Sequence, residues 1–218
     1  MKHRLYKMLF VAILFVCGTT SAMALNNASL ARTILDKTAK IVGRSGGASA
    51  SFTMSSASTG TISGTIAVKG RKFNARTQQA IVWFDGKTQW TYMRKNNEVN
   101  VSTPTIAQQQ TMNPYTFINI YKSGYKLATQ TSGANHLVHL VAQNRKQSIQ
   151  EMYITINKNT YIPSVVKMKH GNKWYTIAIA SLPPRTSQIV FLFSTLRIIL
   201  QQKLLTFANK DIIYAISY

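Results

Sequence analysis

The stretch that follows Asn27 places apolar residues at helical spacing, at Leu30, Ile34, Leu35, Ile41 and Val42. Thr38 fills the turn between them, so the set forms one apolar stripe of an amphipathic helix. Asn27 is a suitable N-cap because its side chain can accept a hydrogen bond from the first turn, and Gly43 is a suitable stop. The pattern predicts a helix over residues 28–42.

Beyond this helix the pattern changes to an alternation of apolar and polar residues. Ile62, Ile66 and Val68 alternate with threonine and serine, which is typical of a strand with one buried face. Asp85-Gly86 separates two further predicted strands, over 80–84 and 87–93. This dipeptide tolerates the positive φ of a tight hairpin turn. Short polar turns separate the remaining runs, so we expect antiparallel pairing throughout, with further strands over 99–102, 124–130, 136–142, 149–156, 164–169 and 173–180.

Two segments depart from the strand pattern. Residues 114–121 follow a Gln-rich polar stretch and predict a short helix closed by Gly124, which either covers a mouth or face of the sheet or fills the core. Residues 187–218 match neither strand nor helix periodicity, and we expect an atypical tail of divergent or frameshifted origin. Within this tail, residues 189–200 are too few and carry Arg197, which argues against a transmembrane helix.

The first 24 residues have the organisation of a secretory signal peptide. Lys2, Arg4 and Lys7 precede the apolar run 8–16, and Ala22-Met23-Ala24 predicts cleavage before Leu25. An uncleaved anchor is the alternative. The single cysteine, Cys17, lies inside this segment after the bulky Val16, which favours its removal over lipidation of the cysteine. We therefore expect an exported periplasmic protein without thiols or disulfides.

The charge of the chain is strongly positive, with 26 Lys and Arg residues against 5 Asp and Glu residues and a formal net charge of +21. Removal of the predicted signal peptide leaves 23 basic and 5 acidic residues, a net charge of +18. Basic residues cluster at 69–72 and 94–95, near Phe73, Trp90 and Tyr92. Three interpretations follow: a solvated face, a surface for anionic lipid or another anionic partner, and single-stranded nucleic acid, which an exported protein rarely meets.

Candidate catalytic groups are scarce. The five carboxylates are scattered singly, which argues against paired-acid hydrolases and carboxylate-bound metals. His136 and His139 are three apart on a predicted strand, so their side chains point to opposite faces and would not share a metal ion. No nucleophile elbow, phosphate-binding loop or metalloprotease motif is present in the sequence. We therefore expect a protein that is not an enzyme and that needs no cofactor or metal.

Large apolar side chains recur on the predicted strands and their flanks. A sheet can bury such residues against a helix, in a filled core, or by curling around an apolar cavity. The candidates for such a cavity are Phe52, Ile66, Val68, Phe73, Trp83, Trp90 and Tyr92.

The order of these segments resembles the LolA family, the periplasmic carriers of outer-membrane lipoproteins. The resemblance runs from the amphipathic helix through Ala50-Ser51-Phe52-Thr53 and Ser63-Gly64-Thr65-Ile66-Ala67-Val68-Lys69. It is strongest in Ile81-Val82-Trp83-Phe84-Asp85-Gly86-Lys87-Thr88-Gln89-Trp90-Thr91-Tyr92, which is similar to a hairpin of that family. Asn113-Pro114-Tyr115-Thr116-Phe117 stands where the family carries an Asn-Pro helix, and the resemblance covers roughly residues 28–180.

This resemblance implies a mainly β (α+β) fold, with a strongly curved antiparallel sheet forming an incomplete barrel, an N-terminal helix and a short lid helix. The domains would be a signal peptide (1–24), a carrier domain (25–186) and the tail (187–218). Acyl chains would occupy the cavity named above, and the lid would involve Arg71, Tyr115, Phe117 and Ile118, where Arg71 stands in for a family arginine displaced by one position.

The resemblance also implies the partners of the chain. These would be acylated lipoproteins, an inner-membrane release complex and an outer-membrane acceptor. The positive charge adds an anionic membrane surface, export argues against nucleic acid, and we expect a monomer. The alternative function is a non-enzymatic periplasmic binding domain for anionic glycolipid or polysaccharide.

Overall fold

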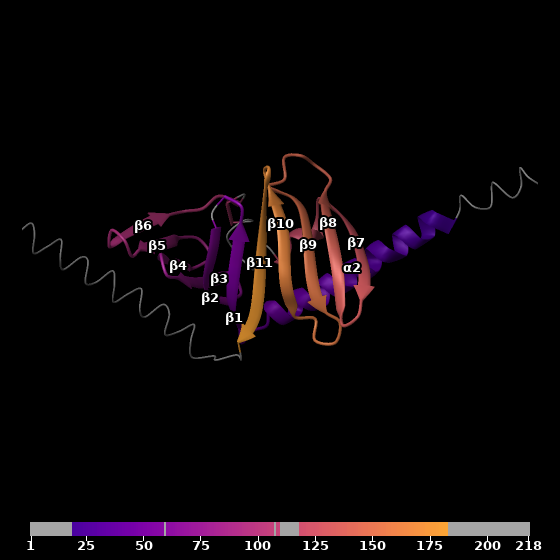
Figure 1. Cartoon of the computed structure of the whole chain (residues 1–218), viewed down its shortest axis with the longest axis horizontal. Coiled ribbons are helices and arrows are strands. Elements are labelled where there is room, and N and C mark those ends of the chain that lie inside the picture. Colours follow the sequence, from indigo (N-terminus) through magenta and orange to yellow (C-terminus); the bar gives the residue numbers. More distant parts are fainter. Residues whose placement is uncertain (1–18, 59, 107, 110–117, 183–218) are drawn as a thin grey trace, which may run out of the picture.

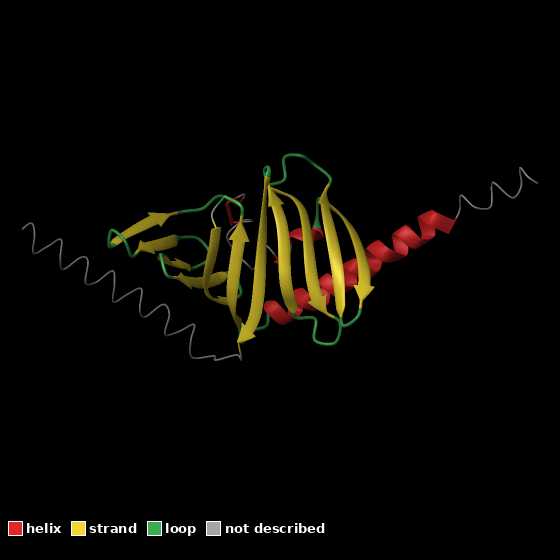
Figure 2. Cartoon of the chain, in the orientation of Figure 1, coloured by secondary structure: helices red, strands yellow, loops and turns green. Residues whose placement is uncertain are grey.

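A computed structural model describes residues 19–58, 60–106, 108–109 and 118–182 of the chain. The long helix α2 (Thr19–Val42) is followed by one antiparallel sheet of eleven strands and a short 3₁₀ helix, η1 (Ile120–Lys122) (Figures 1 and 2). The strands are β1 (Ala48–Ser56), β2 (Gly60–Lys69), β3 (Lys72–Thr77), β4 (Ala80–Phe84), β5 (Gln89–Met93), β6 (Glu98–Ser102), β7 (Tyr125–Ser132), β8 (Asn135–Ala142), β9 (Ile149–Asn157), β10 (Pro163–His170) and β11 (Lys173–Leu182).

The strand order across the sheet is β6-β5-β4-β3-β2-β1-β11-β10-β9-β8-β7. Two runs of consecutive hairpins therefore meet where β1 pairs with the last strand, β11, in antiparallel register from Ser49–Leu182 to Ser55–Thr176. The sheet stays open because β6 and β7 form its two edges. In Figure 1 the strands β4–β6 run across the direction of β8–β11, so the sheet is strongly curved. This arrangement confirms the predicted fold class.

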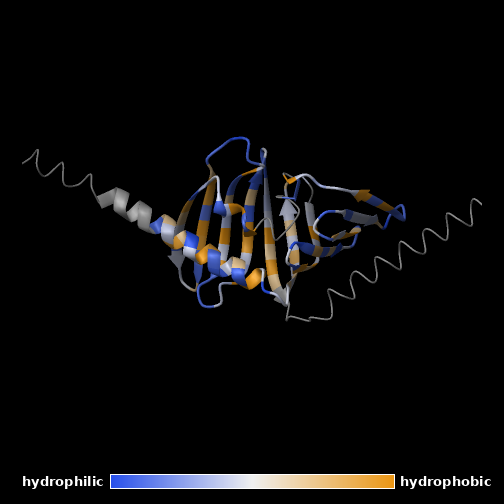
Figure 3. Ribbon diagram, turned by 180° about the vertical axis from the view of Figure 1, so that it is seen from behind, coloured by the Kyte–Doolittle hydropathy of each residue, from blue (hydrophilic) through white to orange (hydrophobic). Residues whose placement is uncertain are grey.

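Helix α2 packs on one face of the sheet, which we call the inner face, and contacts β7 (Figure 3). Two polar contacts fix its position: Asn27 Oδ1 accepts a hydrogen bond from the backbone N–H of Thr129 at 2.5 Å, and the Tyr121 hydroxyl donates to Asp36 Oδ1 at 2.5 Å. The helix buries Ala31, Ile34 and Leu35 in the main core, whose sheet residues include Leu140, Ile149, Met152, Ile154, Ile156, Val138, Val166 and Met168.

The helix differs from its prediction at the N-terminal end. It begins at Thr19 rather than at Ala28, so Asn27 lies within the helix and its side chain binds β7 instead of capping the first turn. Its C-terminal end at Val42 agrees with the prediction. The predicted stripe is wrong at Leu30, which is 49% exposed, while Ala31 takes the buried position one residue further on. Small residues carry little hydrophobic signal even where they lie at the contact.

Most of the predicted strands are confirmed within two residues of their ends, and the Asp85-Gly86 turn joins β4 to β5 as expected. Asp85 Oδ1 accepts hydrogen bonds from the backbone N–H groups of Lys87 and Thr88, and Gly86 has a φ of +107°. Two strands have no counterpart among the predicted runs. β1 alternates Ala48, Ala50, Phe52 and Met54 with serine and threonine, a strand signal that the prediction missed because two of the four are small alanines, whereas β3 is short and basic. Residues 110–117, which include the first half of the predicted short helix, and the tail 183–218 lie outside the described residues.

Because Tyr125, at the start of β7, is buried in its neutral form, we expect the free energy of unfolding to fall at alkaline pH. The Tyr125 hydroxyl donates to the backbone carbonyl of Ile149 at 2.7 Å, and burial raises its pKa to about 12. An unfolded tyrosine titrates near pH 10, so the stabilisation by the neutral form is complete below about pH 10 and is lost as the pH rises toward 12. We expect Tyr125→Phe to flatten the fall of unfolding free energy over this interval, measured by urea unfolding at several pH values. Equal slopes in the two proteins would contradict this assignment.

Candidate functional site

A strip of apolar side chains runs across the middle of the inner face. On β1, Phe52 and Met54 point to this side; Phe52 pairs with Ile179 of β11, and Met54 pairs with Ile62 of β2 and with Ile177 of β11. All are only partly buried. We call this set the inner strip: Phe52, Met54, Ile62, Ile66, Ile177 and Ile179.

The inner strip lies between two buried clusters. On the β7–β10 side is the main core under α2, against which Ile177 and Ile179 pack. On the other side Val68, Phe73 and Phe84 form a second buried cluster, against which Ile66 packs. The strip is thus a partly accessible apolar surface on strands β11, β1 and β2, continuous with core on both sides.

The curvature of the sheet at the strip depends on Gly64 in β2. This residue pairs with Phe52, and a Cβ atom placed on Gly64 would lie 3.0 Å from Phe52 Cζ and 2.2 Å from the backbone carbonyl oxygen of Arg76 in β3. A glycine within a strand marks a tight bend or a close approach of another backbone. The absence of a side chain at Gly64 therefore lets β3 fold close to β2 and lets the Phe52 ring lie over the strand.

The register divides the seven predicted cavity residues between the two faces. Phe52, Ile66, Val68 and Phe73 lie on the inner face. Phe84 of β4 pairs with Phe73, so Trp83 points to the opposite side, which we call the outer face. There Trp83 pairs with Trp90, and both pack with Ile81 and Tyr92. The structure therefore does not bring Trp83, Trp90 and Tyr92 together with the other four.

Four residues of the inner strip are not among the predicted cavity candidates. Met54 lies two residues after Phe52 on β1, so the alternation of that strand could have identified it, while Ile177 and Ile179 lie on a predicted strand but far from the other candidates in sequence. The alternation around Ile62 predicts that it faces inward, and its pairing with Met54 confirms this. The alternation in 173–180 could have identified the two isoleucines of β11, but the pairing of β11 with β1 has no local sequence signal.

The predicted lid residues are described only in part. Arg71 is exposed in the turn between β2 and β3, and its Cβ lies 3.7 Å from the position of a Cβ on Gly86, so the two turns are neighbours. Ile118 is buried and precedes η1, whose Ile120 and Tyr121 enter the main core. Tyr115 and Phe117 lie outside the described residues.

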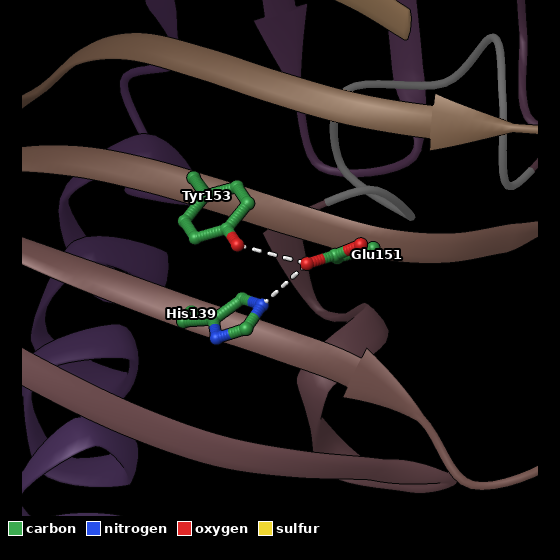
Figure 4. A network of polar contacts seen from close by, with 3 residues as sticks. All are labelled: His139, Glu151 and Tyr153. Atoms are coloured by element: carbon green, nitrogen blue, oxygen red, sulfur yellow. Dashed lines mark hydrogen bonds and ion pairs between the residues drawn. The ribbon is translucent and has the colours of Figure 1, made fainter. Parts of the chain in front are cut away.

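The groups whose pKa is shifted, among the described residues, do not belong to the inner strip. Burial and the hydrogen bond to Asp36 raise the pKa of Tyr121, which belongs to the contact between α2 and η1. On the outer face His139 Nε2 lies 2.9 Å from Glu151 Oε1, and the Tyr153 hydroxyl donates to the same oxygen at 2.8 Å (Figure 4). These hydrogen bonds lower the pKa of Glu151, with the contribution of Tyr153 the largest.

The two strand histidines confirm their predicted orientation. His136 pairs with Ile156, a residue of the main core, and so lies on the inner face, whereas His139 pairs with Tyr153 on the outer face. Within the described parts of the chain, no three His, Cys, Asp or Glu side chains are grouped so that they could hold a metal ion. The strip itself offers apolar contact rather than acid, base or ligand groups.

No helix among the residues that the structure describes is both long enough and apolar enough to span a bilayer.

The chain was compared with known families and proteins. The family model described as "Outer membrane lipoprotein carrier protein LolA" matches residues 20–172. A search of the curated proteins gives no match.

Several solved structures are similar to the chain. A LolA superfamily protein from Nitrosomonas europaea has a TM-score of 0.41 at 10% identity, over 73% of this chain and 96% of that chain. An uncharacterized conserved protein from Thermus thermophilus has a TM-score of 0.47 at 14% identity, over 71% of this chain and 87% of that chain. The lipoprotein LppX from Mycobacterium tuberculosis has a TM-score of 0.38 at 8% identity, over 68% of this chain and 94% of that chain.

Proposed function

The chain belongs to the LolA family of outer-membrane lipoprotein carriers, and we propose that it binds the acyl chains of lipoproteins on its inner strip and carries them toward the outer membrane. The observation that carries this proposal is the strip itself, a partly accessible apolar surface on the inner face of the sheet between two buried clusters.

The chemistry of an acyl chain fits the strip. Each methylene group that leaves water contributes roughly 0.8 kcal/mol, so an acyl chain needs an apolar surface to cross an aqueous compartment. The aliphatic and aromatic side chains of Phe52, Met54 and Ile179 supply such a surface without a charged group among the strip residues. Carriage of this kind forms and breaks no covalent bond, so it requires no catalytic residue and no cofactor.

We place the carrier in the periplasm, after cleavage before Leu25. This position lies inside α2, and the mature chain would keep the helix from Leu25 to Val42. The hydrogen bond from Thr129 to Asn27 and the buried Ala31, Ile34 and Leu35 all lie beyond it. The attachment of α2 to the sheet is therefore compatible with removal of the signal peptide.

The lid remains part of the proposal. Ile118 is buried, and Ile120 and Tyr121 of the neighbouring η1 lie in the main core beside α2. Arg71 would act from the turn between β2 and β3 at one end of this face.

The test of the proposal is the binding of a fluorescent fatty acid and of an acylated lipopeptide to purified protein, compared between Phe52→Glu and Thr53→Glu. The two residues are neighbours on β1 but point to opposite faces, and Thr53 is exposed. An ionised carboxylate on the strip would have to be desolvated by the acyl chain, which costs several kcal/mol. We expect Phe52→Glu to weaken binding at least about tenfold and Thr53→Glu to leave it unchanged.

Mass spectrometry of organic extracts from the protein purified from periplasm gives the second readout. Stoichiometric acylated peptide or phospholipid in wild type, and its loss in Phe52→Glu, is the expected result. Well-folded wild-type protein that yields a clean extract and binds neither probe would overturn the proposal. Recovery of an anionic glycolipid or polysaccharide instead would favour the alternative function.

A further inference from the structure

The outer face of strands β7–β11 carries a regular array of aromatic and basic side chains. The register aligns one row across the strands, Lys126, Val141, Glu151, Lys169 and Trp174. A second row consists of Ala128, His139, Tyr153, Lys167 and Thr176. All of these residues point away from α2, because their neighbours along each strand belong to the inner face.

The aromatic rings of this array are ordered by their contacts. The His139 and Tyr153 rings stack with centroids 4.2 Å apart and an interplanar angle of 4°, and Tyr153 and Trp174 lie 6.2 Å apart (Figure 4 shows the first pair). Lys167 Nζ lies 4.9 Å from the centroid of the Trp174 ring. The rings therefore form a platform over three strands, and none of the three is fully buried.

The charge around this platform is almost entirely positive. Lys126 and Lys167 are exposed, and Lys169 is half-buried beside Glu151. The turns at the same end of the sheet, 143–148 and 171–172, add Arg145, Lys146 and the adjoining Lys173. Glu151 is the single carboxylate residue in the sequence between residues 118 and 182, and its oxygen is engaged by His139 and Tyr153.

We propose that this outer face docks on the surface of a bilayer that carries anionic phospholipid headgroups. We call it the docking face and define it by Tyr153, Trp174, Lys126, Lys167 and Lys169. The inference goes beyond the proposed carriage of acyl chains and does not rest on it, since the docking face and the inner strip lie on opposite sides of the sheet.

Two physical effects favour a bilayer as the partner. Basic residues near an anionic membrane are attracted to it, and each one raises the partition coefficient about fivefold at moderate ionic strength. Tryptophan and tyrosine prefer the boundary between headgroups and acyl chains, because their rings are apolar while their N–H and O–H groups stay hydrated. A sheet face that presents both types of side chain matches this boundary.

The experiment measures sedimentation of the purified protein with vesicles of phosphatidylcholine that contain about one third phosphatidylglycerol. Wild type is expected to bind these vesicles and to dissociate from them as the salt concentration is raised from about 0.05 to about 0.5 M. It is not expected to bind vesicles of pure phosphatidylcholine. The double variant Lys167→Gln/Lys169→Gln is expected to bind about 25-fold more weakly. Trp174→Ala is expected to weaken binding while the net charge is unchanged.

The matched control is Arg32→Gln/Lys40→Gln, which removes the same charge from the exposed side of α2, across the sheet from the docking face. It is expected to bind vesicles within about twofold of wild type, because its charges lie on the other side of the sheet, where salt screens their attraction to the docked surface. Equal loss in both double variants would overturn the proposal, since net charge alone would then explain binding. Binding of the protein to a soluble anionic polysaccharide but not to the vesicles would also overturn the proposal.

The two proposals fail separately. Phe52→Glu is expected to lose acyl-chain probes but to retain vesicle binding, whereas Lys167→Gln/Lys169→Gln is expected to show the reverse. If the wild-type protein binds neither vesicle type, the proposed docking face is overturned, while the proposed binding of acyl chains on the inner strip is unaffected.

Discussion

Replacement of Gly64 by alanine is expected to lower the free energy of unfolding by about 3 kcal/mol. The added Cβ would lie 2.2 Å from the carbonyl oxygen of Arg76 and 3.0 Å from Phe52 Cζ. The first contact is with backbone, which cannot rotate away as a side chain can, so β2 and β3 would have to separate. Urea unfolding followed by circular dichroism measures this loss.

The control for this substitution is Gly46→Ala. Gly46 lies in the turn before β1, has no heavy atom within 4 Å of its Cβ position, and does not have a positive φ. It is expected to leave stability unchanged or to raise it by up to about 1 kcal/mol, because alanine restricts the unfolded chain. A Gly64→Ala protein as stable as Gly46→Ala would show that close approach of β3 does not set the curvature.

This substitution also connects the fold with the proposed function. The Phe52 ring lies against Gly64, so a methyl group there would displace the central aromatic residue of the inner strip. We expect the Gly64→Ala protein that remains folded to bind acyl-chain probes more weakly than wild type.

Replacement of Ile154 by alanine is expected to lower the free energy of unfolding by about 3 to 4 kcal/mol. Ile154 lies in the middle of β9, pairs with Val138 and Val166, and is 1% exposed. Removing three carbon atoms loses their burial and leaves a cavity between the sheet and α2, which the surrounding strands cannot close. Denaturant unfolding at neutral pH gives the value.

The matched control is Val141→Ala on β8. Val141 lies on the outer face and is 38% exposed, so its truncation is expected to cost less than about 0.5 kcal/mol. A loss for Ile154→Ala as small as that for Val141→Ala would contradict the placement of the main core under α2.

Local patterns in the sequence predict much of the fold. Alternation around Ile62, Ile66 and Val68 predicts β2 because a strand that buries one face must place apolar residues at every second position. The apolar runs 80–84 and 136–142, bounded by short turns, predict β4 and β8. The same period places His136 and His139 on opposite faces before any partner strand is known. The turn at Asp85-Gly86 is equally local, because it depends on the φ of one glycine and the side chain of one aspartate.

The candidate site is harder to predict, because alternation fixes the faces within a strand but not between strands. Phe73 and Trp83 share a face only if their strands pair in a suitable register. Phe73 instead pairs with Phe84, which sends Trp83, and with it Trp90, to the outer face. Met54 and Ile177 are partners although more than a hundred residues separate them in the chain.

The sequence by itself therefore determined most of the strands, their antiparallel pairing, the end of the helix and a surplus of positive charge, since each depends on neighbouring residues or on composition. Only the tertiary structure decided which apolar residues share the inner strip and which basic residues gather with Tyr153 and Trp174 on the docking face. The inner strip is assembled by the pairing of β1 with β11, two strands that are distant in sequence, and the docking face by the register between the consecutive strands β7 to β11. Both kinds of pairing are set by the energy of the whole sheet rather than by any one segment.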